Sequence, residues 1–417
     1  MGLVVSALAA LLVSSCGGGG GSQEEEQADT TTAGGGEQAS EVALDAALEQ
    51  SFEESDAPGV VAAVQTPQYT WVRALGVADR TSEEPMTPDV HHRIGSVNKT
   101  FTISLLLQAA DEGLLSLDDT IDRYIEGVPN GDEITLRQMA NMTSGIADYT
   151  SNERFGEDLG SDPQRIWRPE ELVRFGIADS PAFDPGTEFQ YSNTNTVLLG
   201  LVLEQVSGEP IGELYRERII EPLGLQGTSF PDQADASLPE PHAQGYSLLA
   251  WLPVEVDPGE PVDVTDWSPS EAWTAGAMIS TVEDLLAYGR VLGSTGEGLL
   301  PPEQQAERLD SFVSDVPPLN QPPLNGDLAY GLGLENDHGW IGHNGEIPGY
   351  NTNLFYHPEL DAVVAVEVNS EISSGGCPED MPTMTDGPLS IPCADPADRI
   401  FRALAEALGK PAPALGP

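Results

Sequence analysis

A serine and a lysine three residues apart are the first side chains in this sequence that could perform chemistry together. Ser96 and Lys99 open the segment 96–110, whose apolar residues fall on nearly every side of a helix. Residues three apart on a helix share a face. A serine hydroxyl becomes a good nucleophile when a nearby base takes its proton, and burial lowers the pKa of a lysine amine enough for that role. Lysine is also rare, since only Lys99 and Lys410 occur.

The same residues allow a purely structural interpretation. Ser96 can cap the helix while Lys99 stays in solvent on the first turn. A helix that is apolar on all sides favours the chemical interpretation, because such a helix is buried inside a sizeable protein. The positive potential of the helix N-terminus would also stabilise negative charge that develops beside Ser96.

Two further groups of polar residues lie far along the chain. Tyr191 and Asn193 precede a helical segment at 197–206. A phenol can pass a proton to a leaving group, and an amide can hold a substrate carbonyl or the lysine amine. His343 and Gly345 lie on a late β-prone segment, where glycine permits close approach of a ligand. Taken alone, each group is better explained by a half-buried tyrosine, a helix cap or a histidine at the end of a strand.

The order of these motifs is far more specific than any one of them. Ser-x-x-Lys at 96–99, Tyr-Ser-Asn at 191–193 and His-x-Gly at 343–345 resemble the serine β-lactamase and penicillin-binding-protein superfamily. The similarity is greatest to class C β-lactamases, D-alanyl-D-alanine carboxypeptidases and related esterases, and it covers nearly all of residues 45–405. Supporting phrases are Pro58-Gly59-Val60, Thr143-Ser144-Gly145 and Phe183-Asp184-Pro185-Gly186.

This resemblance implies a mechanism and a set of roles. Ser96 would attack an amide, lactam or ester carbonyl to form an acyl-enzyme, while Lys99 and Tyr191 move protons to and from Ser96 and the leaving group. The backbone amides of Ser96 and Glu346 would form the oxyanion hole. His343 stands where many relatives have lysine and would add a positive charge that depends on pH. The resemblance implies neither a metal nor an organic cofactor.

Several residues depart from the pattern of these relatives. Asn344 replaces the usual Thr, Met142 replaces a His, and Glu346 follows the glycine. A carboxylate at Glu346 would repel an anionic substrate if it faced the cleft, and strand alternation leaves its direction open. The segment 325–341 contains no Arg or Lys that could hold a substrate carboxylate. These departures weaken carboxypeptidase and β-lactamase activity more than serine acyl transfer in general.

The distribution of elements predicts an α+β fold. β-prone segments at 59–64 and 69–77 suggest a hairpin, and β-prone segments return at 340–343, 352–356 and 362–368. We expect one antiparallel sheet built from both ends of the chain, flanked by helices, with a mostly helical second lobe at roughly 111–325. A cleft between lobes is a common place for a site. Further helices are expected at 42–52, 213–219, 281–292 and 396–408.

The first residues have the pattern of an export signal. A short apolar run ends in small residues before Cys16, as in bacterial lipoprotein signals, although Lys and Arg are absent before the run. We expect residues 1–16 to be a signal peptide, with lipid on Cys16 holding the protein at the outer side of the cell membrane. Residues 17–40 read as a flexible acidic, Gly-rich tether. The hydrolase domain is expected at 41–410.

Export would place the remaining cysteines in an oxidising compartment. Cys377 and Cys393 are then expected to form a disulfide. The bridge would close a loop of about 15 residues and stabilise the protein by roughly 3 kcal/mol in the chain-entropy model. A metal site at these cysteines is not expected, because no His or Cys pair flanks them at ligand spacing.

The charge balance limits the possible partners. The chain has 68 acidic and 17 basic residues, a net charge of −51, so a nucleic-acid partner is excluded by repulsion. The acidity is explained equally by adaptation to high salt and by an acidic surface of no specific purpose.

Together these features predict a serine acyl hydrolase that acts outside the cytoplasm. Peptidoglycan D-alanyl peptides are the favoured substrate, because a lipid anchor would place the enzyme beside them. A secreted esterase acting on small esters or amides is the alternative within the same fold. A catalytically silent peptidoglycan-binding protein is a third possibility, against which the complete set Ser96, Lys99 and Tyr191 argues.

Overall fold

The computed structural model describes most of the chain after the N-terminal segment. The described residues are 40–55, 57–247, 261–313, 316–318, 327–371 and 395–413. The predicted signal peptide, almost all of the predicted tether, and the three residues Cys16, Cys377 and Cys393 lie outside them. Lipidation and the disulfide therefore stay predictions.

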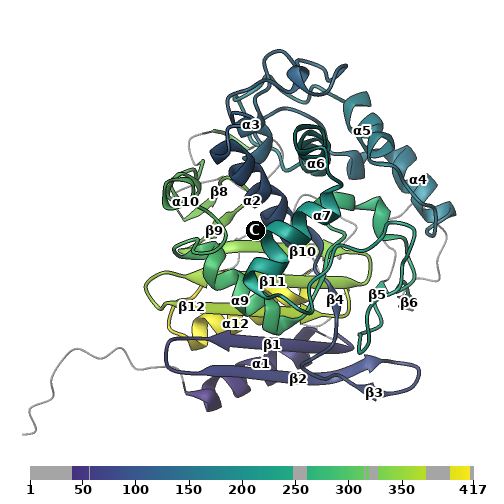
Figure 1. The fold of residues 1–417 in the computed structure, drawn as a ribbon. Helices are drawn as coiled ribbons and strands as arrows, with labels where there is room; N and C mark the ends of the chain where they lie inside the picture. The colour runs from purple at the N-terminus through teal and green to yellow at the C-terminus, as the bar shows by residue number, and fades with distance from the viewer. Residues whose placement is uncertain are drawn as a thin grey trace, which may run out of the picture. The chain divides into compact units, whose positions relative to one another are not determined.

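An antiparallel eight-stranded sheet forms the centre of the fold, in the order β3-β2-β1-β12-β11-β10-β9-β8 (Figure 1). β1 and β12 are neighbours in the middle of the sheet, with Val60 opposite Val368. The expected α+β fold, with one sheet assembled from both ends of the chain, is confirmed. Its strands are β1 (Gly59–Gln65), β2 (Thr70–Asp79), β3 (Glu84–Pro85), β8 (Leu328–Tyr330), β9 (Glu335–Asp337), β10 (Trp340–Ile347), β11 (Tyr350–His357) and β12 (Ala362–Val368).

Two short strand pairs lie outside this sheet. β4 (His92–Arg93) pairs with β7 (Ile279–Ser280), and β5 (Tyr246–Ser247) pairs with β6 (Val262–Asp263). The first pair matters for the site, because β4 ends immediately before the segment that contains Ser96. Pairing with β7 therefore fixes where that segment begins.

Helices cover both faces of the large sheet, so its central strands are apolar on both sides. On one face lie α1 (Glu41–Ser55) and α12 (Pro396–Ala407) (Figure 1). Their apolar residues join those of the sheet in what we call the α1/α12 core, which includes Leu48, Val64, Phe355 and Phe401. On the other face lie α2 (Asn98–Asp111) and α9 (Val282–Gly293), which belong to a larger cluster, the α2/α9 core.

The remaining helices belong mostly to the middle of the chain, as the sequence predicts, and several lie away from the sheet (Figure 1). The helix expected at 213–219 is instead a short α-helix continued by a π-helical turn at 216–220. Among the described helices, none is both long and apolar enough to span a bilayer. The other helices are α3 (Leu136–Ala140), α4 (Glu153–Ser161), α5 (Pro169–Ala178), α6 (Asn193–Ser207), α7 (Ile211–Tyr215), α8 (Glu221–Leu223) and α10 (Pro302–Leu309).

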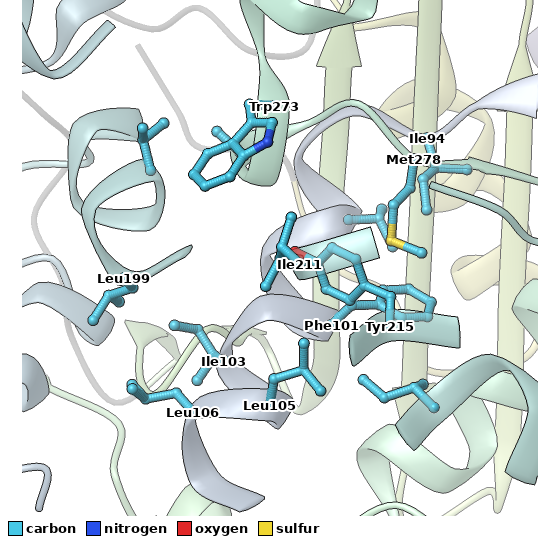
Figure 2. Close-up of a cluster of buried hydrophobic side chains, with 14 of the residues drawn as sticks. Ile94, Phe101, Ile103, Leu105, Leu106, Leu199, Ile211, Tyr215, Trp273 and Met278 are labelled. Atoms are coloured by element: carbon cyan, nitrogen blue, oxygen red, sulfur yellow. The ribbon is translucent and has the colours of Figure 1, made fainter. Parts of the chain in front are cut away.

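Helix α2 is buried on all sides, as its composition predicts. Phe101 stacks on Tyr288 of α9, with ring centroids 3.8 Å apart. Figure 2 shows further residues of α2 among side chains of α6, α7 and the loop that contains Trp273. Burying one large apolar side chain stabilises a fold by about 1.5–3 kcal/mol, so α2 is fixed firmly. A single 3₁₀ turn, Gly95–Val97, precedes it.

Candidate active site

The start of α2 brings the predicted nucleophile and the predicted base together. Lys99 Nζ lies 2.8 Å from Ser96 Oγ and 2.7 Å from the backbone carbonyl oxygen of Ala275. Ser96 is half-buried, whereas Lys99 is fully buried. A substrate can therefore reach the hydroxyl while bulk water does not solvate the amine, which is the arrangement that a general base needs.

Burial lowers the pKa of Lys99 from 10.5 to about 7. Loss of solvation is the largest cause, and the negative charges of Asp148, Glu335 and Glu271 oppose it. A substantial fraction of the amine is therefore neutral near pH 7, when its lone pair can accept the Ser96 proton. A lysine with an ordinary pKa is almost fully protonated at this pH.

Tyr191 comes from another part of the chain, just before α6. Its hydroxyl is buried and has no hydrogen-bond partner among the described residues, although the Ser96 hydroxyl lies close enough to act on its pKa. Burial is the largest cause that raises the pKa of Tyr191 well above 10. The phenol is therefore protonated. It is better suited to give a proton to a leaving group than to take one from Ser96.

Two glycines let the 3₁₀ turn and β10 approach closely. Gly95 has a φ of +50°, and a Cβ there would lie 2.6 Å from the amide nitrogen of Glu346. A Cβ on Gly345 would lie 2.1 Å from the carbonyl oxygen of Ile94 and 3.1 Å from the amide nitrogen of Ser96. The backbone at Ser96 and Glu346 is therefore adjacent. This proximity is what the predicted oxyanion hole requires.

The Glu346 side chain faces away from the catalytic serine. Side chains alternate along β10, where Trp340 belongs to the α1/α12 core and Ile341 packs against the α2/α9 core. The pairing with β11 continues in register from Ile341 to Ile347. Glu346 thus shares the face of Trp340, and its charge acts on Asp395 beside α12. Its carboxylate is not placed to repel a substrate at Ser96.

Asn193 does not hold the lysine amine. Its backbone N–H and its side-chain Nδ2 donate to the two carboxylate oxygens of Asp148, at 3.2 and 3.1 Å. Thr150 donates to the same carboxylate through its amide and its hydroxyl. Of the two contacts considered for Asn193, the one with the Lys99 amine is not made, and that amine contacts the Ser96 hydroxyl and the Ala275 carbonyl. Contact with a substrate carbonyl stays a prediction.

His343 lies beside Tyr191 but does not carry the expected charge. The ring is fully buried, and its centroid lies 6.0 Å from that of Tyr191. Burial is the largest cause that lowers the pKa of His343 to about 3, and the charge of Lys99 lowers it further. The ring is therefore neutral at physiological pH. The expectation of a pH-dependent positive charge from His343 is corrected, because a buried imidazole next to an amine does not take up a proton.

Sequence analysis missed the groups that support these residues. Ala275 acts through its carbonyl oxygen, which no side-chain pattern reveals, although it lies in a run of small residues at 275–281. Tyr330 and Glu335 approach His343, with Tyr330 Oη 3.0 Å from Nε2 and Glu335 Oε1 3.5 Å from Nδ1. The segment 325–341 contains no Arg or Lys, and it contributes to the site through this tyrosine and this glutamate.

Two buried arginines show which charged groups are available to bind a substrate carboxylate. Arg308 is fully buried, acts on the charge of His343, and donates to backbone carbonyls and the Ser104 hydroxyl. Arg93 is buried as well and donates to carbonyl oxygens. Arg308 is therefore not free to hold a substrate carboxylate, whereas Nη1 of Arg93 is buried without a hydrogen-bond partner among the described residues. Among the described residues, no group of three or more His, Cys, Asp or Glu side chains is arranged to hold a metal ion.

The sequence matches the Beta-lactamase family over residues 44–380, most of its length. The chain belongs to this family. Membership places the chain in the β-lactamase and penicillin-binding-protein superfamily. The resemblance noted from the three motifs is thereby confirmed at the level of the superfamily.

Several solved structures of this superfamily are similar to the chain. A D-stereospecific amidohydrolase from Streptomyces sp. is 32% identical, with a TM-score of 0.69 over 79% of this chain and 94% of the other. A D-amino acid amidase from Ochrobactrum anthropi SV3, solved with D-phenylalanine, is 25% identical, with a TM-score of 0.71 over 88% and 99%. A penicillin-binding protein homologue from Pyrococcus abyssi, described as octameric, is 25% identical, with a TM-score of 0.68 over 88% and 77%.

Two relatives with curated names are longer than this chain. Protein flp of Staphylococcus aureus (strain MW2) is 25% identical over 80% of this chain and 64% of its own length. Unguisins hydrolase ungD' of Aspergillus campestris (strain IBT 28561) is 25% identical over 78% of this chain and 61% of its own length. The chain thus spans less than two thirds of these relatives.

Proposed function

We propose that the chain is a serine amide hydrolase that forms an acyl-enzyme at Ser96, with D-amino acid amides and short D-peptides as substrates. The observation that carries the proposal is the buried Lys99 amine, 2.8 Å from the Ser96 hydroxyl and with a pKa of about 7. Neutral Lys99 takes the Ser96 proton while Oγ attacks the carbonyl. The resulting oxyanion is held by the amides of Ser96 and Glu346.

Collapse of the tetrahedral intermediate needs a proton on the leaving amine. Tyr191 supplies it, because its pKa keeps the phenol protonated and its hydroxyl lies near Ser96. Lys99 then returns the proton taken from Ser96 to the phenolate, so the acyl-enzyme forms with both groups in their starting states. Water attacks the acyl group by the same route in reverse.

The choice of substrate rests on the charges around the site and on the names of two structural neighbours. Those neighbours are described as a D-stereospecific amidohydrolase and a D-amino acid amidase. Arg308, the buried arginine whose charge acts on His343, is engaged with backbone carbonyls and the Ser104 hydroxyl. A substrate with a neutral C-terminus therefore suits the described site better than one with a free carboxylate.

Peptidoglycan D-alanyl-D-alanine peptides, favoured by the sequence, remain a second candidate. The Glu346 side chain lies on the face of β10 that points away from Ser96. It therefore does not repel the terminal carboxylate of such a peptide, which removes one objection to this substrate. The engagement of Arg308 with the protein remains an objection. A secreted esterase is the third possibility, since an ester needs the same nucleophile and less help for its leaving group.

A substrate panel tests the proposal. Labelling with a fluorophosphonate should modify Ser96, and the folded protein should hydrolyse D-phenylalanine amide faster than L-phenylalanine amide and faster than it releases D-Ala from a D-Ala-D-Ala peptide. Faster release of D-Ala would favour the carboxypeptidase. Hydrolysis of p-nitrophenyl acetate alone would favour the esterase, and no labelling of folded protein would reject an acyl-enzyme at Ser96.

A further inference from the structure

Two contacts determine which nitrogen of His343 carries the proton. Nδ1 lies 2.5 Å from the carbonyl oxygen of Asn344. A carbonyl only accepts hydrogen bonds, so Nδ1 carries the hydrogen and Nε2 presents a lone pair. The Tyr330 hydroxyl, 3.0 Å from Nε2, must therefore donate to it. Glu335 Oε1, 3.5 Å from Nδ1, favours the same tautomer.

Tyr330 and His343 both pack against the ring of Tyr191. The Tyr330 ring meets it edge-on, at 85° and with centroids 6.0 Å apart. The His343 ring centroid is also 6.0 Å away, and Lys99 Nζ lies 5.0 Å from the centroid of Tyr191. Three neighbours thus fix the orientation of this phenol. Tyr330 also belongs to a small apolar cluster with Met142 and Phe189, against which Tyr191 packs.

The protonation state of His343 decides what Tyr191 can do. A positive charge on the His343 ring, whose centroid lies 6.0 Å from that of Tyr191, would stabilise a phenolate, and Tyr191 would lose the proton it has to donate. Hydrogen bonding to the neutral form of a group disfavours its charged form. The donation from Tyr330 to Nε2 therefore opposes a charge on His343, in addition to burial and the charges of Lys99 and Arg308.

We propose that Tyr330 is a positioning residue for the reaction: by donating to His343 Nε2 it keeps the imidazole neutral and fixes Tyr191 as a protonated donor to the leaving group. This inference rests on the proposed function. In the step concerned, the C–N bond breaks, its electron pair stays on nitrogen, the Tyr191 proton goes to that nitrogen, and Lys99 re-protonates the phenolate. Tyr330 itself neither gains nor loses a proton.

Substrates with different leaving groups test this role. An amide nitrogen needs a proton to leave, whereas p-nitrophenolate leaves without one. Tyr330→Phe should lower kcat/KM for D-phenylalanine amide about tenfold and for p-nitrophenyl acetate less than about twofold, because one hydrogen bond of this kind is worth up to a factor of about ten. A general loss of structure would lower both rates equally, so the amide-to-ester ratio is the quantity to measure.

A matched control is available in the same sheet. Tyr350 is also fully buried, and its hydroxyl donates to the Ala243 carbonyl at 2.9 Å. Tyr350→Phe removes a comparable hydrogen bond away from Tyr191 and should leave the amide-to-ester ratio unchanged. If Tyr330→Phe does not fold, His343→Leu gives a second test, because leucine at this position cannot take up a charge. This variant should keep an amide-to-ester ratio near that of the wild type, and a tenfold fall would contradict the claim that an uncharged side chain at 343 is what Tyr191 needs.

The outcomes separate this inference from the proposed function. A wild-type protein that is folded but not labelled at Ser96 would reject the proposed function itself. A wild-type protein that hydrolyses both substrates, with a ratio that Tyr330→Phe does not change, would reject only the role of Tyr330. An equal fall of both rates would also reject it, because Tyr330 would then be merely structural.

Discussion

The two faces of the large sheet differ in how they bury ionisable side chains. On the α1/α12 face the core is apolar, with Phe401 stacked on Phe355 at 4.7 Å, and the half-buried Arg402 beside it is paired with carboxylates. Arg402 there lies 2.6 Å from Asp398 and 3.0 Å from Asp337. On the α2/α9 face the protein buries Lys99, which is fully enclosed and has no ion pair shorter than 4 Å within the described residues.

This difference shows how stability and reactivity are divided in the molecule. Burying an ionisable group without a partner of opposite charge costs free energy and shifts its pKa toward the neutral form. A well-packed apolar face can offset that cost, because its large side chains each contribute a few kcal/mol. The α1/α12 face thus stabilises the fold, while the opposite face keeps an amine reactive.

The largest effect is expected from removing the buried amine. Lys99→Ala should lower the rate of Ser96 labelling by about 10²- to 10⁴-fold, because the general base is lost. The protein should remain folded, since the substitution removes a desolvated group. Lys410→Ala is the matched control: the other lysine of the chain lies near the surface and pairs with Glu359. An equal rate in the Lys99 variant and the control would remove Lys99 from the mechanism.

On the α1/α12 face, a substitution is expected to lower stability without changing the reactivity of Ser96. Phe401→Ala should lower the free energy of unfolding by about 3–5 kcal/mol, because a fully buried aromatic ring is replaced by a cavity. The pH dependence of labelling in the remaining folded protein should not move. Denaturant unfolding measures the first quantity, and Leu114→Ala, at an exposed residue, should change it by less than about 0.5 kcal/mol. A shifted pH profile would show that the two faces are not independent.

Glu367 should behave as a second desolvated group on the α2/α9 side of the sheet. Its carboxyl is buried, neither oxygen has a hydrogen-bond partner among the described residues, and burial raises its pKa well above 4.5. A raised pKa gives stability that is fully present below pH 4.5 and is lost as the pH rises through the folded-state value. Glu367→Leu should therefore stabilise the protein by about 2 kcal/mol at pH 8 and by less at pH 5.

Thermal unfolding at the two pH values measures this difference. Glu406→Leu, at an exposed position of α12, is the control. It should change the stability by the same small amount at pH 5 and at pH 8. Equal stabilisation at pH 5 and pH 8 by Glu367→Leu would mean that the carboxyl is not desolvated in the folded state.

Local sequence patterns predicted the elements of this comparison well. The segments 59–64 and 362–366 are continuous apolar runs, because both faces of their strands are covered. The helix beginning near Ser96 reads as apolar on all sides for the same reason. Their burial follows from residue types alone, so pattern analysis detects it.

Long-range contacts were not predictable in the same way. The contact from Lys99 to the Ala275 carbonyl joins residues 176 apart, and it involves a backbone atom. The bond from Asn193 to Asp148 could not be predicted, because Asp148 lies 45 residues earlier and has no motif of its own. The neutral state of His343 depends on burial and on Tyr330, neither of which its own motif reveals.

The central claim is that burial makes Lys99 the base for Ser96, and the pH dependence of Ser96 labelling tests it most directly. The labelling rate should rise with pH through an ionisation near 7 and then level off, because Lys99 must lose its proton before it can accept one. That ionisation should disappear in Lys99→Ala. A rate that rises only near pH 10, or an ionisation near 7 that persists without Lys99, would contradict the account.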